Sequence, residues 1–184
     1  MDLVIDIGNT LAKVAAMEGG EIAALHTFER LDIAQIAQIE ARHTFRRAIL
    51  CSVRERDEVL CGYLREKYRC FVEFTGTTPT PLTNRYETPE TLGPDRLAAA
   101  VGAQALFPGR NVLVVDLGSA ITIDLVSAAG EFLGGNISPG AALRFRSLNR
   151  FTARLPLYNF SDEISLLGKE TSEAIRNGVV NGIR

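Results

Sequence analysis

The strongest constraint on the fold is an internal repeat that relates the two halves of the chain. VIDIGNT at residues 4–10 aligns with VVDLGSA at residues 114–120, at an offset of 110 residues. At that offset one aspartate, two glycines and one glutamate recur: Asp6 and Asp116, Gly8 and Gly118, Gly20 and Gly130, Glu21 and Glu131. The repeat indicates a duplication that gives two lobes with a cleft between them.

Hydrophobic patterning predicts strands and helices throughout the chain. Strands are expected at 2–7, 11–17, 21–28, 46–53, 70–75, 111–116, 120–127 and 131–137, and helices at 31–42, 55–68, 95–107, 140–150 and 170–183. The helix at 55–68 is expected to turn Val59, Leu60, Tyr63 and Leu64 inward. Residues 76–94, rich in threonine and proline, are expected to form a long irregular segment, which in a compact chain is usually functional or disordered.

Composition narrows the class of protein. Hydrophobic residues make up 46% of the 184 residues and charged residues 23%, which excludes disorder as the main state. The formal net charge of −2 argues against overall attraction to nucleic acid or anionic lipid. The chain has no run of about 18 apolar residues and no basic N-terminal start, so we expect a cytoplasmic protein with no membrane or nucleic-acid partner. Three widely spaced cysteines, Cys51, Cys61 and Cys70, fit buried thiols better than a zinc site.

The two repeated glycine turns are candidate phosphate-binding sites. A strand that ends in aspartate before a glycine turn exposes backbone N–H groups that can cradle phosphate. The aspartate can hold Mg²⁺, which prefers oxygen ligands. One such turn would be read as an ordinary hairpin, but two matching turns favour phosphate. No GxxxxGK[ST] sequence occurs, so a P-loop is excluded.

Several motifs, in order along the whole chain, resemble one family. DIGNTLAK at 6–13, GPDR at 93–96, DLGSAITID at 116–124, GG at 134–135 and PG at 139–140 resemble the motifs of type III pantothenate kinases. LNRFTARLP at 148–156 and GKETSEAIRNG at 168–178 resemble the family's later segments. The family belongs to the acetate and sugar kinase, Hsp70 and actin superfamily. It uses ATP to phosphorylate pantothenate to 4′-phosphopantothenate, the first step of coenzyme A biosynthesis.

The resemblance implies an α/β fold of duplicated ribonuclease H-like (actin-like) lobes, each a mixed sheet flanked by helices. The lobes would be residues 1–110 and 111–184, the second truncated, because the family continues past this point with another strand and a Gly-Gly turn. The resemblance also implies a homodimer, Mg²⁺ and a monovalent cation, K⁺ or NH₄⁺.

Roles for individual residues follow from the resemblance. Asp95 would be the general base. Tyr86, Gly93, Pro94, Asp95, Arg96 and Thr171 would contact pantothenate. ATP would be bound by Asp6, Ile7, Gly8, Asn9, Thr10, Leu11, Ala12, Lys13 and Ser119, with Asp6 near Mg²⁺ and Asp116 on the monovalent cation. Ser119 replaces the family's usual threonine and keeps the hydroxyl, and Pro94 fills a position that is often small and suits a first helical residue.

Some of these residues also have ordinary structural explanations. Asp95 in a first helical turn offsets the helix dipole, Lys13 can occupy the outward face of its strand, and Thr171 can be an N-cap. Arg144, Arg146, Arg150 and Arg154 favour a solvated surface or dimer contacts over nucleic acid, and Asp124 has no assigned role.

Two other functions stay open. One is a non-catalytic regulator like the Bvg accessory factor proteins, against which the presence of Asp6, Asp95 and Arg96 argues. The other is a superfamily phosphotransferase acting on a sugar or polyphosphate, against which GPDR with Tyr86 argues.

Overall fold

A computed structural model describes all 184 residues, which form two compact units. Unit 1 comprises residues 1–112 and 125–134, and unit 2 comprises residues 113–124 and 135–184. The strands at 112–139 contribute to both units, so the chain leaves unit 1 and returns to it before it ends in unit 2.

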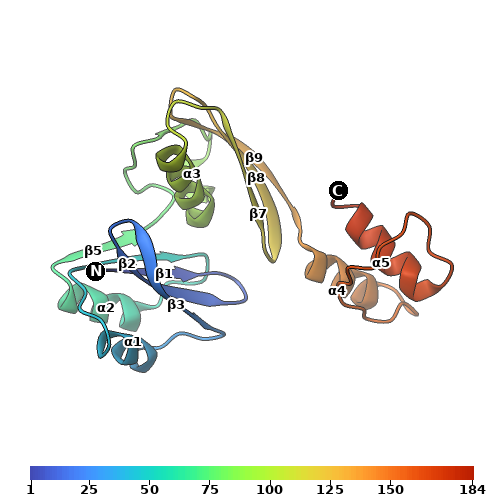
Figure 1. The fold of residues 1–184 in the computed structure, drawn as a ribbon, viewed down its shortest axis with the longest axis horizontal. Helices are drawn as coiled ribbons and strands as arrows, with labels where there is room; N and C mark the ends of the chain where they lie inside the picture. Colours follow the sequence, from blue (N-terminus) through green and yellow to red (C-terminus); the bar gives the residue numbers. More distant parts are fainter. The chain divides into compact units, whose positions relative to one another are not determined.

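A five-stranded mixed sheet forms the centre of unit 1 (Figure 1). Its order is β3-β2-β1-β4-β5, in which β1 pairs antiparallel with β2, and β4 pairs parallel with both β1 and β5. The strands span β1 (Asp2–Ile7), β2 (Ala12–Glu18), β3 (Glu21–Phe28), β4 (Arg47–Ser52) and β5 (Cys70–Phe74). The five predicted strands of this half are confirmed within one residue at each end.

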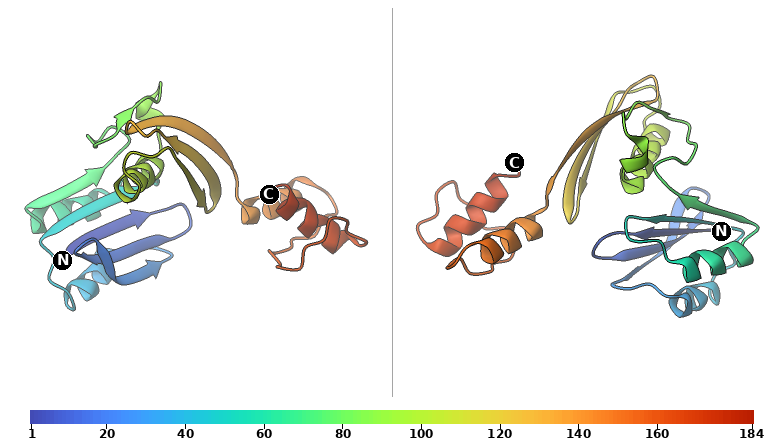
Figure 2. Two further views of the ribbon diagram at one scale, coloured as in Figure 1. Left: turned by 45° about the horizontal axis from the view of Figure 1, so that its top comes forward. Right: turned by 180° about the vertical axis from the view of Figure 1, so that it is seen from behind.

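Helices cover both faces of this sheet. Figures 1 and 2 show α1 (Ile33–Glu40) and α2 (Glu58–Lys67) on one face and α3 (Pro94–Leu106) on the other. Alternate residues of β1, Leu3 and Ile5, are fully buried against the face that carries α1 and α2, because successive strand residues point to opposite faces. The Asp6 side chain therefore points to the opposite face of the sheet.

The α2 core prediction is correct at three residues and wrong at Val59. Leu60 and Leu64 are buried and Tyr63 packs against the same core, whereas Val59 is 72% exposed. Leu60 and Leu64 are four residues apart and share a helix face, while Val59 is turned by one residue onto the solvent side.

A second, four-stranded sheet has the order β6-β9-β8-β7. Its strands are β6 (Thr83–Asn84), β7 (Val112–Leu117), β8 (Ala120–Val126) and β9 (Glu131–Pro139). The repeat offset places β1 on β7 residue for residue, and Gly20 and Gly130 both have positive φ, 91° and 76°. The turns after these strands differ, because β2 starts at Ala12 and β8 starts at Ala120. The turn after β1 is therefore two residues longer than its counterpart.

Two helices complete unit 2, α4 (Ala141–Phe151) and α5 (Thr171–Asn181), with Phe145, Ile175 and Val179 as their shared core. Arg144 belongs to this packing and not to an exposed cluster, since its guanidinium donates to the carbonyls of Pro139 (2.8 Å) and Gly182 (2.9 Å). Arg146, Arg150 and Arg154 are exposed, as expected for a solvated surface.

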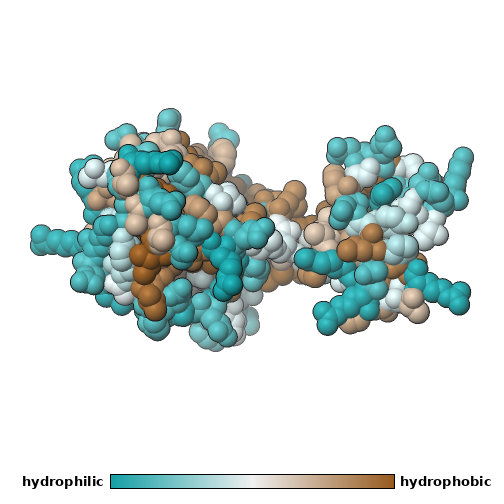
Figure 3. All heavy atoms as spheres, turned by 90° about the horizontal axis from the view of Figure 1, so that it is seen from below, coloured by the Kyte–Doolittle hydropathy of each residue, from teal (hydrophilic) through white to brown (hydrophobic).

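Apolar side chains also lie on the surface of the unit 2 strands. Leu113, Val115 and Leu117 of β7 are at least half exposed, and Figure 3 shows hydrophobic surface over this strand segment. None of the helices has the length and apolar character needed to cross a membrane.

Candidate active site

Two of the expected carboxylates, Asp6 and Asp95, lie close to one thiol at the end of the unit 1 sheet. Asp6 is the penultimate residue of β1, and its register partner on the parallel strand β4 is Cys51. Asp95 is the second residue of α3, which packs on β4. Burial, together with the negative charges of Asp6 and Asp95, raises the pKa of Cys51 to about 12. The structure thus places both carboxylates near Cys51, Asp6 beside it on the neighbouring strand and Asp95 on the helix that packs on β4, although they lie 89 positions apart in sequence.

The start of α3 fixes the position of Asp95. Gly93 is the N-cap and Pro94 the first helical residue, which has no N–H to leave unpaired. The Asp95 carboxylate accepts a hydrogen bond from the Arg96 backbone N–H at 2.9 Å. A Cβ at position 93 would lie 2.5 Å from Asp95 Oδ1, so only glycine leaves room for this orientation of the carboxylate.

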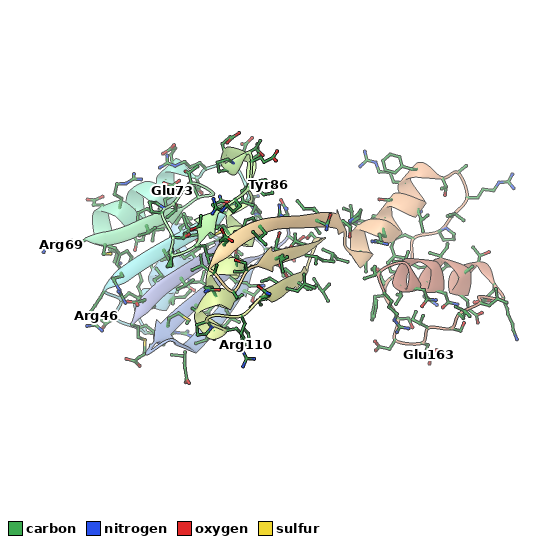
Figure 4. All side chains as sticks on the ribbon, turned by 90° about the horizontal axis from the view of Figure 1, so that it is seen from above. Arg46, Arg69, Glu73, Tyr86, Arg110 and Glu163 are labelled. Atoms are coloured by element: carbon green, nitrogen blue, oxygen red, sulfur yellow. The ribbon has the colours of Figure 1, made fainter.

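Tyr86 is held by short strand pairing at β6. The Thr83 and Arg85 amides donate to the carbonyls of Gly130 and Phe132, both at 2.9 Å, and thereby attach the segment before α3 to β9. The Tyr86 amide donates to Asn84 Oδ1 at 2.9 Å. With the 3₁₀ turn η1 (Pro89–Thr91), β6 is the only regular structure in residues 76–93, so most of this segment is irregular as predicted. Tyr86 is labelled in Figure 4.

Arg96 lies beside two neighbouring aromatic rings inside unit 1, whose centres are 6.1 Å apart. Its guanidinium carbon lies 5.5 Å from the centre of the Tyr86 ring and 5.9 Å from that of Phe132, and the residue is 5% exposed. A guanidinium is attracted to the faces of aromatic rings, and its N–H donors form a fork that matches a carboxylate. Arg96 therefore combines a buried position beside two aromatic rings with the donor pattern that matches a carboxylate.

The turn of residues 8–11 follows Asp6. The Gly8 amide donates to the Leu11 carbonyl at 2.9 Å, and Asn9, Thr10 and Leu11 are exposed. Lys13 pairs with Asp6 across β1 and β2 and is exposed, so it occupies the same face of the sheet as Asp6. An exposed turn beside a lysine offers backbone donors and one positive charge to an anion.

The remaining predicted site residues lie in unit 2. Asp116 is exposed near the end of β7, and Ser119 lies in the turn before β8. The N-cap of α4, Gly140, packs against this turn, because a Cβ there would lie 2.2 Å from the Gly118 carbonyl. A helix start against a glycine turn can bind an anion.

Thr171 is the first residue of α5 and not its N-cap, which is Glu170. It lines an apolar groove of about 760 Å³ between α4 and α5, with Leu148 and Ile175. The structure therefore leaves the Thr171 hydroxyl at the edge of a groove and gives it no capping role.

The carboxylates fit a metal only together with a ligand. No group of three or more histidine, cysteine, aspartate or glutamate residues could hold a metal ion alone. Mg²⁺ is usually bound by one or two carboxylates, with phosphates and water completing its shell, and Asp6 near Asp95 suits that pattern.

Sequence reasoning missed or left unassigned three residues here. Cys51 and Phe132 carried no signal, because their neighbours come from strand pairings that the sequence does not reveal. Asp124 is 1% exposed beside Gly135, whose absent Cβ would lie 2.4 Å from Asp124 Oδ1. The available signal for this contact was the order of the two motifs, in which TxD at 122–124 is followed by GG at 134–135.

The family profile and the curated relatives agree on one family. The sequence profile described as type III pantothenate kinase matches residues 2–184. A type III pantothenate kinase of Phocaeicola vulgatus is 40% identical over 183 residues, which are 100% of this chain and 76% of the relative. Another from Azobacteroides pseudotrichonymphae is 44% identical over 185 residues, 100% of this chain and 75% of the relative.

A solved structure shares the fold. It is described as a Baf family transcriptional activator from Campylobacter jejuni, and it matches with a TM-score of 0.63 and 28% sequence identity. The match covers 98% of this chain and 75% of that one.

Proposed function

Since this chain belongs to the type III pantothenate kinase family, a family of phosphotransferases that act on pantothenate, we propose that Asp95 and the turn after β1 perform its reaction. The observation that carries this assignment is the placement of Asp6 at the end of β1, beside β4, and of Asp95 at the start of α3, which packs on β4. Phosphoryl transfer needs an acceptor oxygen, a phosphate and a metal at one point, with a carboxylate that takes or orients the hydroxyl proton.

Asp95 acts on the acceptor. The pantothenate hydroxyl donates its hydrogen bond to the Asp95 carboxylate, which orients the oxygen. The carboxylate receives the proton as the bond from this oxygen to the γ-phosphorus of ATP forms, the bond from that phosphorus to the bridging oxygen breaks and ADP leaves. The Arg96 amide holds the carboxylate in place for this role by donating a hydrogen bond to it, and Gly93 leaves room for the carboxylate because it has no Cβ. Positioning supplies most of the acceleration in such transfers, so this fixed orientation is central to the assignment.

ATP phosphates occupy the turn at residues 8–11. Backbone amides of the turn and the Lys13 ammonium neutralise their charge, and residues Asp6 to Lys13 form this subsite. Asp6 would hold Mg²⁺, which when bound neutralises charge on the phosphates. The longer turn after β1 offers more backbone donors than its repeat after β7, which supports this placement.

Arg96 recognises the carboxylate end of pantothenate. The Tyr86 and Phe132 rings both lie beside its guanidinium. Gly93 and Pro94 bring the backbone of the GPDR segment close to the substrate. A planar guanidinium binds a carboxylate through two parallel hydrogen bonds, which a lysine does not reproduce.

Unit 2 supplies the remaining proposed contacts. Ser119 contacts ATP, Thr171 contacts pantothenate, and Asp116 provides a carboxylate ligand to a monovalent cation, K⁺ or NH₄⁺. We assign the two halves, 1–110 and 111–184, to duplicated ribonuclease H-like lobes, supported by the coincidence of β1 with β7. A homodimer and a cytoplasmic location are also part of the proposal.

A regulatory function has one observation in its favour, the name of the structural relative from Campylobacter jejuni. That relative is 28% identical, whereas the kinases from Phocaeicola vulgatus and Azobacteroides pseudotrichonymphae are 40% and 44% identical. The kinase assignment therefore outweighs it.

The test compares the kcat of the Asp95→Asn variant with that of a matched control, Asp32→Asn. Both replace a carboxylate at the start of a helix, and Asn keeps an oxygen that can accept the same backbone hydrogen bond. We expect Asp95→Asn to lower kcat by about 10²–10⁴-fold, the usual contribution of a general base, with ATP affinity retained. Asp32→Asn should keep the activity of the unaltered chain. Full turnover by Asp95→Asn would overturn the assignment of the base.

A further inference from the structure

One arginine is bound to the proposed phosphate turn through the backbone. Arg54 Nε donates to the Gly8 carbonyl at 2.7 Å, and Arg54 Nη2 donates to the Asn9 carbonyl at 3.2 Å. Two successive carbonyls of the turn thus bind one guanidinium from a segment 45 residues later in the chain. Nothing in the sequence motifs or in the family resemblance singled out Arg54.

The exit of β4 brings Arg54 to this position. β1 and β4 lie side by side (Figure 2), and the Val53 amide extends their ladder by donating to the Ile7 carbonyl at 3.0 Å. The Arg54 amide then donates to Ser52 Oγ at 3.1 Å, which turns the chain at the level of Gly8. The backbone therefore holds the arginine beside the turn before its side chain makes any contact.

Arg54 differs in this from its neighbour Arg56. Both side chains line a cavity of about 460 Å³ at the ends of β1, β4 and β5. Arg56 is bound by carboxylates, those of Glu58 and Glu73, whereas the hydrogen bonds of the Arg54 guanidinium go to the turn's carbonyls. The two arginines therefore share a location and an exposed surface but differ in what they hold.

The contact determines where the turn's amides point. In a trans peptide unit, the C=O of one residue and the N–H of the next point in opposite directions. Arg54 draws the carbonyls of Gly8 and Asn9 toward itself, so the amides of Asn9 and Thr10 are directed away from it. Backbone amides in that orientation are the donors that a phosphate requires.

We infer that Arg54 is a positioning residue for the ATP phosphates: it orients the Asn9 and Thr10 amides by binding the carbonyls of Gly8 and Asn9. This inference rests on the proposed phosphate role of the turn. Arg54 itself does not touch the phosphate, because its donors are directed to the carbonyl side of the turn. Its effect is specific to nucleotide, since Tyr86 and Arg96 are held by other contacts.

The test measures the Kd for Mg²⁺-ATP by calorimetry, and the KM values for ATP and pantothenate, in the full chain. The variants are Arg54→Ala, Arg54→Lys and the matched control Arg56→Ala. We expect Arg54→Ala to weaken ATP binding about ten- to a hundredfold, the effect of losing charge-assisted hydrogen bonds, without change in the KM for pantothenate. Arg54→Lys should recover part of the affinity, because an ammonium provides the charge but not the fork. Added guanidinium ion should improve ATP binding by Arg54→Ala alone.

Three results would overturn the inference. The first is ATP affinity of Arg54→Ala equal to that of Arg56→Ala. The second is an equal loss of affinity for ATP and pantothenate without rescue by guanidinium, which would indicate a merely structural role. The third is an unaltered chain that binds no nucleotide; this also removes the proposed function, whereas the first two leave that function intact.

Discussion

Replacing Gly93 with alanine should separate activity from stability. The backbone at Gly93 has φ −56° and ψ 126°, a conformation open to any residue, so alanine meets no backbone strain there. Its Cβ, however, would lie 2.5 Å from Asp95 Oδ1. The carboxylate oxygen has to retreat by about 1 Å to reach ordinary contact distance.

The two effects of this movement differ in size. Misplacing a catalytic group by about 1 Å costs on the order of 10²-fold in rate. Stability changes little, because losing the hydrogen bond from the Arg96 amide costs about 1 kcal/mol and the lower entropy of the unfolded alanine variant returns about 0.4–1 kcal/mol. We therefore expect a large loss of kcat with a melting temperature within about 3 °C of the unaltered chain.

The assay is steady-state ADP release with pantothenate and ATP, beside thermal unfolding. Gly102→Ala in the same helix is the matched control, because nothing lies within 4 Å of its added Cβ. It should keep full activity and gain about 0.5–1 kcal/mol of stability. Normal kcat in Gly93→Ala would refute the claim that Asp95 must be held in its observed orientation, and so would a loss of activity fully explained by unfolding.

Three further predictions follow from the packing and electrostatics of the chain. Gly135→Ala places a Cβ 2.0 Å from the Ile123 carbonyl oxygen and should lower the free energy of unfolding by about 1–3 kcal/mol. Chemical denaturation measures this change, and an unchanged denaturation midpoint would contradict the packing. Burial raises the pKa of Glu40, but hydrogen bonds from Lys67, Tyr63 and Tyr68 outweigh it and hold the pKa below the ordinary value of 4.5. The ionised carboxylate therefore stabilises the fold above pH 4.5, and this contribution disappears as the pH falls through the lower folded pKa. The free energy of unfolding of Glu40→Gln should therefore depend less on pH, between acidic and neutral pH, than that of the unaltered chain. An equal pH dependence of the two proteins would disprove this. Buried Cys51, with its pKa raised to about 12, should resist alkylation at pH 8, whereas exposed Cys70 should react. Peptide mass spectrometry measures the labelling of each cysteine, and equal labelling would contradict the burial of Cys51.

The sequence was most informative about the strands and the repeat. β1 could be predicted to the residue, because an apolar run ends in an acid and a glycine turn. The apolar run of 111–116 predicted β7 within one residue. The GPDR segment marked the start of α3, since proline and aspartate suit a first helical turn. The ends of β1 and the start of α3 depend on the residues next to them in sequence, and these can be read directly from the chain.

The errors and omissions arose where distant segments meet. The apolar pattern predicts an inward Val59, because helical periodicity alone does not show which of two adjacent apolar positions faces the sheet. Arg144 was grouped with exposed arginines, since its contact with the Gly182 carbonyl depends on the packing of α4 against α5. Arg54 and Phe132 gain their contacts only through the pairing of β4 with β1 and of β6 with β9.

The central claim is that this chain transfers phosphate from ATP to pantothenate. Its most direct test is to incubate the unaltered chain with ATP, Mg²⁺ and K⁺, with and without pantothenate, and to measure ADP and phosphorylated pantothenate by mass spectrometry. We predict that both products appear in equal amounts and only when pantothenate is present. ADP release that ignores pantothenate, or nucleotide binding without any phosphorylated product, would contradict the account.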